Sequence, residues 1–165
     1  VVSGGEPTIH DDLQDLLRKI KGLGLKVKLD TNGTNPNMLE YLISENLIDY
    51  IAMDIKAPLN TKYSDAAGVK VNLEDIKRSI DLIESSGIDY EFRTTIVPIF
   101  LSKDDVYSII SELSGSKKYA LQQFRPDYTL DPALSELKPY PSEIIMDLAN
   151  AAQKVVSTVT VRGDV

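Results

Sequence analysis

A repeating pattern of apolar and polar residues runs along the chain: a short β-rich run, then turn residues, then an amphipathic stretch of helical period. Within each amphipathic stretch, apolar residues recur three and four positions apart, as they do on the buried face of a helix. The pattern predicts helices near residues 9–22, 36–46, 73–86, 103–114 and 142–154. It predicts strands at residues 1–3, 26–32, 49–56, 90–97, 119–125 and 158–162.

Residues with short polar side chains precede the predicted helices, where they would accept hydrogen bonds from the free N–H groups of the first turn. The predicted caps are Thr8, Asn35, Asn72, Ser102 and Ser142. A longer polar stretch follows the third strand, and a loop rich in proline and aspartate spans residues 126–141. Six strands that alternate with five helices indicate an α/β fold with a parallel sheet and right-handed crossovers.

Two architectures remain open from this pattern, a doubly wound open sheet and part of a (β/α) barrel. The chain has 165 residues, a length typical of one domain and sufficient to bury a core. We therefore expect a single domain over residues 1–165.

One face of the predicted strands is polar, although strands of a buried parallel sheet are usually apolar on both faces. Side chains alternate between the two faces of a strand, so Val27 and Leu29 lie opposite Lys28 and Asp30. On the fifth strand, Ala120 and Phe124 oppose Leu121, Gln123 and Arg125. The charged face as a whole would carry Lys28, Asp30, Asp54, Lys56, Glu91, Arg93 and Arg125.

Burying unpaired charges costs several kcal/mol each, so this face needs a partner. Either water covers it, or the charges pair in a lumen around a ligand of mixed charge. We favour the lumen, because a parallel sheet rarely has a wet face.

Composition narrows the classes of function. Eighteen Lys and Arg residues against 25 Asp and Glu give a net charge of −7, which argues against a general binder of phosphate backbones. No cysteine is present, which excludes disulfides, thiolate nucleophiles and cysteine-ligated metals within these residues. No apolar run approaches the roughly 20 residues of a membrane span, and no signal or transit pattern is found. We expect a cytoplasmic protein without a nucleic-acid or membrane partner.

The segment Gly4-Gly5-Glu6-Pro7-Thr8 lies at the first strand-to-helix junction. Paired glycines allow backbone groups to approach a ligand closely. Glu6 can accept hydrogen bonds from a ligand ammonium, and Pro7 directs the chain away. Charged residues also gather at the C-terminal ends of the other strands, the edge at which α/β barrels and open sheets bind ligands.

Three motifs together resemble the radical S-adenosylmethionine (SAM) superfamily: Gly4-Gly5-Glu6-Pro7, Asp30-Thr31-Asn32-Gly33 and Asp54-Ile55-Lys56. Within it, the chain most resembles the glycyl-radical-enzyme activating enzymes, and among these the anaerobic ribonucleoside-triphosphate reductase activating proteins. That branch is indicated by Phe92-Arg93-Thr94-Thr95-Ile96-Val97-Pro98, Gln122-Gln123-Phe124-Arg125-Pro126 and Val161-Arg162-Gly163. The resemblance covers essentially all 165 residues and implies a partial (β/α)6 TIM-like barrel that lacks its first strand–helix unit.

The resemblance also implies a SAM site. In it, Gly4, Gly5, Glu6 and Pro7 would hold the methionine moiety, and Asp30, Thr31, Asn32 and Asp54 would lie near the SAM carboxylate. Two acids at that place need a cation between them, so Asp30 and Asp54 are candidate ligands of a monovalent cation. Lys56 would reach the carboxylate or the ribose, and Arg93, Gln123 and Arg125 would line the SAM site or the substrate channel.

The cluster-binding motif of the family, three cysteines spaced CxxxCxxC ahead of the glycine motif, has no counterpart in this sequence. The resemblance therefore implies a 4Fe-4S cluster in a full-length protein only, and an N-terminally truncated chain with no catalytic residue of its own. In the family, an electron from the cluster cleaves SAM to a 5′-deoxyadenosyl radical, which takes a hydrogen atom from a glycine of the partner enzyme. We expect this chain alone to be inactive.

The parent protein is expected to be an oxidoreductase that activates an anaerobic ribonucleotide reductase or a related glycyl radical enzyme. Its partners would be that protein substrate and an electron donor such as flavodoxin or ferredoxin. Two alternatives stay open: another radical SAM maturase or modifying enzyme, for example one like pyruvate formate-lyase activase, and a non-catalytic SAM-binding module. An exposed edge beside residues 1–3 would favour pairing with another chain, and so a homo-oligomer.

Overall fold

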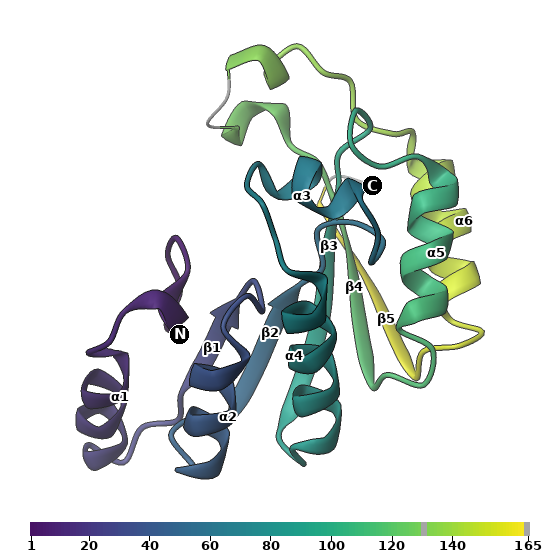
Figure 1. Cartoon of the computed structure of the whole chain (residues 1–165). Coiled ribbons are helices and arrows are strands. Elements are labelled where there is room, and N and C mark those ends of the chain that lie inside the picture. The colour runs from purple at the N-terminus through teal and green to yellow at the C-terminus, as the bar shows by residue number, and fades with distance from the viewer. Residues whose placement is uncertain (130–131, 164–165) are drawn as a thin grey trace. The chain divides into compact units, whose positions relative to one another are not determined.

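A computed structural model describes residues 1–129 and 132–163 of the chain (Figure 1). The strands are β1 (Lys28–Thr31), β2 (Tyr50–Asp54), β3 (Asp89–Ile96), β4 (Lys118–Gln123) and β5 (Thr158–Arg162). They form one sheet in the order β1-β2-β3-β4-β5. Pairing is parallel between β1 and β2, between β3 and β4, and between β4 and β5, as the alternation of strands and helices predicts.

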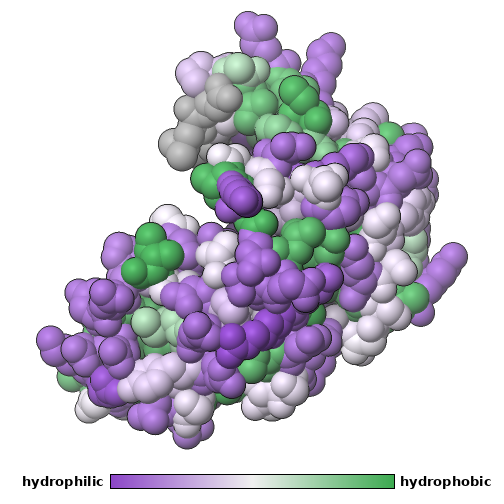
Figure 2. All heavy atoms as spheres, viewed as in Figure 1, coloured by the Kyte–Doolittle hydropathy of each residue, from purple (hydrophilic) through white to green (hydrophobic). Residues whose placement is uncertain are grey.

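The helices follow the same alternation. The α-helices are α1 (Leu13–Gly22), α2 (Pro36–Ser44), α3 (Lys62–Ala67), α4 (Leu73–Ser85), α5 (Lys103–Glu112) and α6 (Ser142–Ala152). Three short 3-10 turns are η1 (Pro7–Ile9), η2 (Pro126–Tyr128) and η3 (Pro132–Leu134). None of the described helices is both long and apolar enough to cross a membrane. Figure 2 shows a face on which hydrophilic residues predominate, with smaller groups of hydrophobic residues among them.

The described chain divides into two compact units. The first unit comprises Val1–Asp54 and Val71–Glu91, and the second comprises Ile55–Lys70 and Phe92–Val165. The single domain expected over residues 1–165 stays a prediction.

In the first unit, α2 and α4 lie side by side. Asn35 and Asn72 cap them as predicted, because each side-chain oxygen accepts a hydrogen bond from an N–H of the first turn. Pro36 occupies the first helical position of α2, where its missing N–H costs nothing. The fully buried large side chains of this unit are Leu17, Leu29, Leu39, Leu42, Ile51, Met53, Ile76 and Ile83.

The start of the chain differs from the prediction. Residues 1–3 do not form a strand; Val2 alone bridges to Leu29, with its N–H donating to the Lys28 carbonyl at 2.8 Å. Gly4 follows with a φ of +119°, outside the range of a strand. The helix expected from residue 9 begins at Leu13, because the preceding residues form the separate turn η1.

In the second unit, α5 and α6 pack side by side and α6 covers β4 and β5 (Figure 1). Ser102 caps α5 as predicted and forms a capping box with Asp105. Ser142 was wrong as the cap of α6, because it is the first helical residue and Pro141 is the cap. Proline holds its φ near the helical value, so the chain enters the helix directly after it.

Two connections hold more structure than their sequences indicate. The polar stretch after β2 contains α3, in which Tyr63 is the one buried side chain, so no apolar periodicity marks this helix. The loop at 126–141 contains η2 and η3, and residues 130–131 of that loop lie outside the described residues.

Asp49 ties α1 to the segments around β1 and β2. Its carboxylate accepts hydrogen bonds from Lys21 Nζ at 2.8 and 2.9 Å and from the Val27 N–H at 2.7 Å. The Lys21 ammonium and the Val27 N–H lower the pKa of the Asp49 carboxyl from its ordinary value of 3.8.

We expect Asp49→Asn to lower the free energy of unfolding by about 1–2 kcal/mol at neutral pH, measured by urea denaturation. Because the pKa of Asp49 is lower in the folded state than in the unfolded state, its charge stabilises the fold at any pH above the unfolded-state pKa. This stabilisation is lost as the pH falls through the folded-state pKa. The difference between variant and wild type should therefore shrink below about pH 4. Asp11→Asn, on an exposed residue before α1, is the control. An unchanged difference at acid pH would contradict the assigned role of the Asp49 charge.

Candidate functional site

The glycine motif forms an exposed loop in the first unit. Gly4 and Gly5 are both exposed, and no heavy atom lies within 4 Å of the place where a Cβ would stand on either residue. Gly4 needs its φ of +119°, which residues with a side chain rarely adopt. A cavity of about 330 Å³ lies beside this loop and is lined by Val2, Ser3, Gly4, Gly5, Pro7, His10, Leu13 and Leu16. The loop thus presents backbone groups, without side chains, to an open space.

Glu6 anchors this loop to the end of β1. Its Oε1 accepts hydrogen bonds from Thr8 N at 3.1 Å, Thr8 Oγ1 at 2.6 Å and Thr31 Oγ1 at 2.8 Å. Its Oε2 accepts one from Asn32 N at 2.6 Å. Glu6 is only 8% exposed. A carboxylate offers about two acceptor sites on each oxygen, and here three of the four donors share Oε1 while one reaches Oε2. The direct contact between Glu6 and a ligand ammonium stays a prediction.

The turn after β1 is held by hydrogen bonds of its own side chains and by one hydrogen bond that Asn35 donates to η1. Thr31 Oγ1 accepts from Gly33 N at 3.1 Å, and Asn32 Oδ1 accepts from Thr34 N at 3.0 Å. Asn35 Nδ2 donates to the carbonyl of Thr8 at 2.7 Å. Glu6, Thr8 and residues 31–35 therefore form one hydrogen-bonded group, which attaches the end of the glycine loop to β1.

Charges on the polar face of β1 pair with one another, as expected from the sequence. Lys28 Nζ lies 3.5 Å from Asp30 Oδ1 and 3.5 Å from Glu91 Oε1. The same ammonium lies 5.5 Å from the centre of the Tyr50 ring, within the range of a cation–π contact. Glu91 is 6% exposed, and the Lys28 ammonium offsets its charge in this buried position. A ligand among these charges stays a prediction.

Asp30 and Asp54 lie on the same face of neighbouring strands. In the register of β1 and β2, Asp30 is opposite Ala52, and Asp54 follows Ala52 by two residues. The described residues contain no group of three or more His, Cys, Asp or Glu side chains placed to hold a metal. A monovalent cation between Asp30 and Asp54 stays a prediction.

The second unit holds the other four predicted site residues. Arg93 is opposite Ala120 in the register of β3 and β4, whereas Gln123 is opposite Ile96 and therefore lies on the other face. The face assigned to Gln123 from the sequence was wrong. Residues 119–121 are all buried, so both faces of β4 are covered there and no alternation of polar and apolar residues distinguishes them.

The remaining two of these residues lie outside the strands. Arg125 is exposed beyond the end of β4, and Lys56 is exposed just after Ile55, whose N–H donates to the Arg93 carbonyl at 2.8 Å. Gln123 Nε2 donates to the Tyr140 carbonyl at 2.7 Å. Their predicted contacts with a ligand stay predictions.

The roles of two residues around the glycine loop were not predicted from the sequence. Thr8 was wrong as a helix cap, because it lies inside η1 and Asp12 occupies the cap position of α1. Its N–H and hydroxyl instead donate to Glu6. Ser79 Oγ donates to the Gly33 carbonyl at 2.7 Å from the buried face of α4. A small polar residue among the buried isoleucines of that face was the available signal.

Comparison with known proteins adds independent findings. The profile of the radical SAM superfamily matches residues 1–113. The chain is 36% identical over 168 residues to "Putative glycyl-radical enzyme activating enzyme MJ1227" of Methanocaldococcus jannaschii, covering 98% of this chain and 69% of that relative. It is 26% identical over 123 residues to the AdoMet-dependent heme synthase of Oleidesulfovibrio alaskensis, covering 70% of this chain and 30% of that relative.

A solved structure shares the fold. It is the crystal structure of a domain of pyruvate-formate lyase-activating enzyme from Bacteroides vulgatus ATCC 8482, with a TM-score of 0.76 at 15% identity. The match covers 98% of this chain and 96% of that chain. The likeness confirms the expected partial barrel fold.

Proposed function

The chain belongs to the radical SAM superfamily, and from that premise we propose that it is the SAM-binding barrel portion of an activating enzyme that generates a glycyl radical on a partner protein. The observation that carries the proposal is the glycine loop, whose exposed backbone is held by Glu6 at the end of β1. The 36% identity to a relative named as a glycyl-radical enzyme activating enzyme supports the choice within the superfamily.

The glycine loop fits the amino-acid end of SAM. Gly4 and Gly5 leave open space above their backbone, so their carbonyl groups can accept hydrogen bonds from an ammonium. When bound, SAM supplies, on one-electron reduction, the species that removes a hydrogen atom from a glycine. The chain's part in this chemistry is to hold and orient the methionine moiety.

The other assignments are part of the same proposal. Asp30, Thr31, Asn32 and Asp54 would lie near the SAM carboxylate, with a monovalent cation between the two aspartates. Lys56, Arg93, Gln123 and Arg125 would bind SAM or line the channel of the protein substrate. Their support is the match of their motifs to the family.

The 165 residues of the chain cannot supply the ligands of an iron–sulfur cluster, because the sequence contains no cysteine. We infer that the 4Fe-4S cluster required by this chemistry is held by cysteines outside these 165 residues. An electron donor such as flavodoxin or ferredoxin would reduce it.

Anaerobic ribonucleotide reductase is the proposed partner, on the strength of the motifs at 92–98, 122–126 and 161–163. The similarity to a heme synthase favours a different radical SAM modifying enzyme as the second candidate. A SAM-binding module without catalysis is the third.

Two measurements test the proposal in order. Equilibrium dialysis of this chain against labelled SAM should give saturable binding to one site, and absence of saturable binding would contradict the SAM assignment. The cluster-bearing protein, incubated anaerobically with SAM and a reductant, should then produce a glycyl-radical EPR signal on purified anaerobic ribonucleotide reductase. A signal on pyruvate formate-lyase alone would move the assignment to that partner, and cleavage of SAM without either signal would favour the modifying enzyme.

A further inference from the structure

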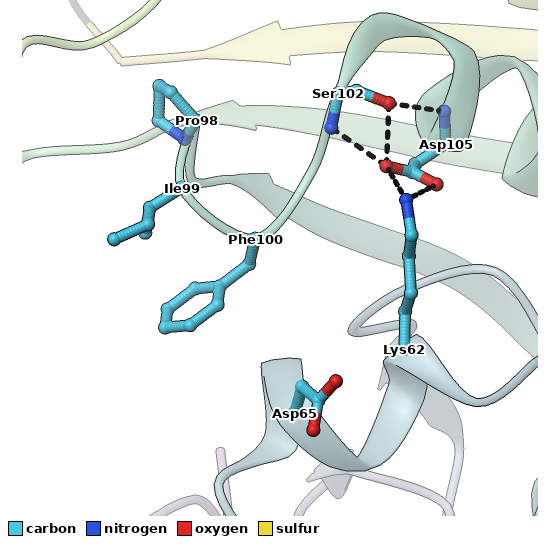
Figure 3. Close-up of a pocket in the computed structure, with 7 residues that line it drawn as sticks. All are labelled: Lys62, Asp65, Pro98, Ile99, Phe100, Ser102 and Asp105. Atoms are coloured by element: carbon cyan, nitrogen blue, oxygen red, sulfur yellow. Dashed lines mark hydrogen bonds and ion pairs between the residues drawn. The ribbon is translucent and has the colours of Figure 1, made fainter.

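A second pocket lies in the second unit, and no predicted SAM-site residue lines it. Its volume is about 290 Å³. It is lined by Lys62, Asp65, Pro98, Ile99, Phe100, Ser102 and Asp105 (Figure 3). These residues come from α3, from the connection after β3 and from the start of α5.

On one wall of the pocket, Lys62, Ser102 and Asp105 are hydrogen-bonded to one another. Lys62 Nζ donates to both oxygens of Asp105, at 2.7 and 2.8 Å. Asp105 also accepts from Ser102 N at 2.9 Å and from Ser102 Oγ at 2.6 Å. The Lys62 ammonium is therefore neutralised within the wall, and it leaves no free positive charge for a ligand.

Asp65 stands on the other side of the pocket with an exposed carboxylate. No side-chain hydrogen bond or ion pair reaches it from the residues that the structure describes. Two carboxylates and one ammonium thus leave the pocket with one net negative charge. Its electrostatic complement is a single cation.

The connection after β3 supplies apolar side chains to the same pocket. Ile99 is 63% exposed and Phe100 is 36% exposed. Figure 3 shows the Lys62 side chain extending to Asp105, while the Phe100 ring and Asp65 lie apart from that pair. An aromatic face beside an unpaired carboxylate suits a guanidinium, which is planar, weakly hydrated and able to stack on a ring while it pairs with an acid.

We propose that this pocket binds an arginine side chain of a partner protein. The guanidinium pairs with Asp65, and its apolar stem packs against Phe100 and Pro98, because long cationic side chains bury their methylenes on apolar surface. That the partner is a protein rests on the proposed function, in which the substrate is a polypeptide. The pocket is a docking site for that partner, and it shares no lining residue with the cavity beside the glycine loop.

The test uses this chain and a fluorescein-labelled peptide that carries one arginine between two leucines. The matched probe has citrulline in place of arginine, which keeps the shape and removes the charge. In fluorescence anisotropy, the arginine peptide should bind about 10- to 150-fold more tightly than the citrulline peptide, as expected for a charge-assisted hydrogen bond. Asp65→Asn should abolish this preference, and Phe100→Ala should weaken both peptides. Glu143→Gln, at an exposed residue of α6 outside the pocket, should change neither.

Equal binding of the two peptides by the wild-type chain, or a preference that survives Asp65→Asn, would overturn the proposal. Free arginine that competes as well as the peptide would also overturn it, since the site would then be one for a small molecule. SAM binding is measured in parallel and should be unaffected by Asp65→Asn. A chain that keeps the arginine preference but fails to bind SAM would refute the proposed function and leave the docking site standing.

Discussion

Glu6→Ala is expected to reduce SAM affinity by about 100-fold and to lower the free energy of unfolding by about 3–5 kcal/mol. The substitution removes the acceptor of four hydrogen bonds, from two groups of Thr8 and from Thr31 and Asn32. Thr8 and Thr31 are buried, so their donors would be left without partners, each at a cost of about 1–3 kcal/mol. The glycine loop would then lose its attachment to β1.

Isothermal titration with SAM and urea denaturation measure the two effects. Glu6→Gln separates the two roles of this residue, because glutamine keeps one oxygen but turns an NH2 group toward the N–H of Asn32. If Glu6 acts by positioning the loop, affinity and stability fall together in this variant. A loss of affinity at unchanged stability would instead favour direct contact with SAM. Glu45→Ala, at an exposed residue after α2, is the control and should stay within about 0.5 kcal/mol of wild type.

The sequence was informative wherever a residue type has one dominant local role. Asn35 and Asn72 cap helices through their own side chains, and the strand predicted at 158–162 is β5 without change. On β1, the alternation of Leu29 with Lys28 and Asp30 indicated both the buried face and the pairing of charges, because one face there is apolar and the other is not.

The sequence was insufficient where both faces of a strand are buried, where an unexpected turn precedes a helix, and where a contact joins residues distant in sequence. Gln123 could not be placed on a face, since the β4 residues before it are buried on both sides. Thr8 has the residue type of a helix cap, but it lies inside η1 and α1 begins only at Leu13, so its hydroxyl has no first-turn N–H of α1 to accept from. The extent of the Glu6 network could not be predicted either, because Thr31 and Asn32 are distant in sequence and meet Glu6 only through the pairing of Val2 with β1.

Gly33→Ala is expected to lower the free energy of unfolding by about 2–5 kcal/mol, measured by urea denaturation. Gly33 lies in the turn after β1 with φ +76°, a conformation that costs alanine about 1–2 kcal/mol. Its Cβ would also overlap Met53 Cε and stand 2.9 Å from Met53 Sδ. Met53 is 0% exposed, so its thioether can move only by displacing other core atoms. Backbone strain and overpacking therefore act together.

Gly87→Ala separates these two costs. Gly87 has φ +75° in the same unit, but no heavy atom lies within 4 Å of its added Cβ, so this variant carries the backbone cost alone. Met53→Ala supplies the complementary test, because it removes the atoms that the new methyl group would overlap. In that background, Gly33→Ala should cost no more than Gly87→Ala does in the wild type, and the double-mutant cycle should give a coupling of about 1–3 kcal/mol. Additive effects of the two substitutions would show that Met53 does not restrict residue 33, and that the turn requires glycine for its backbone conformation alone.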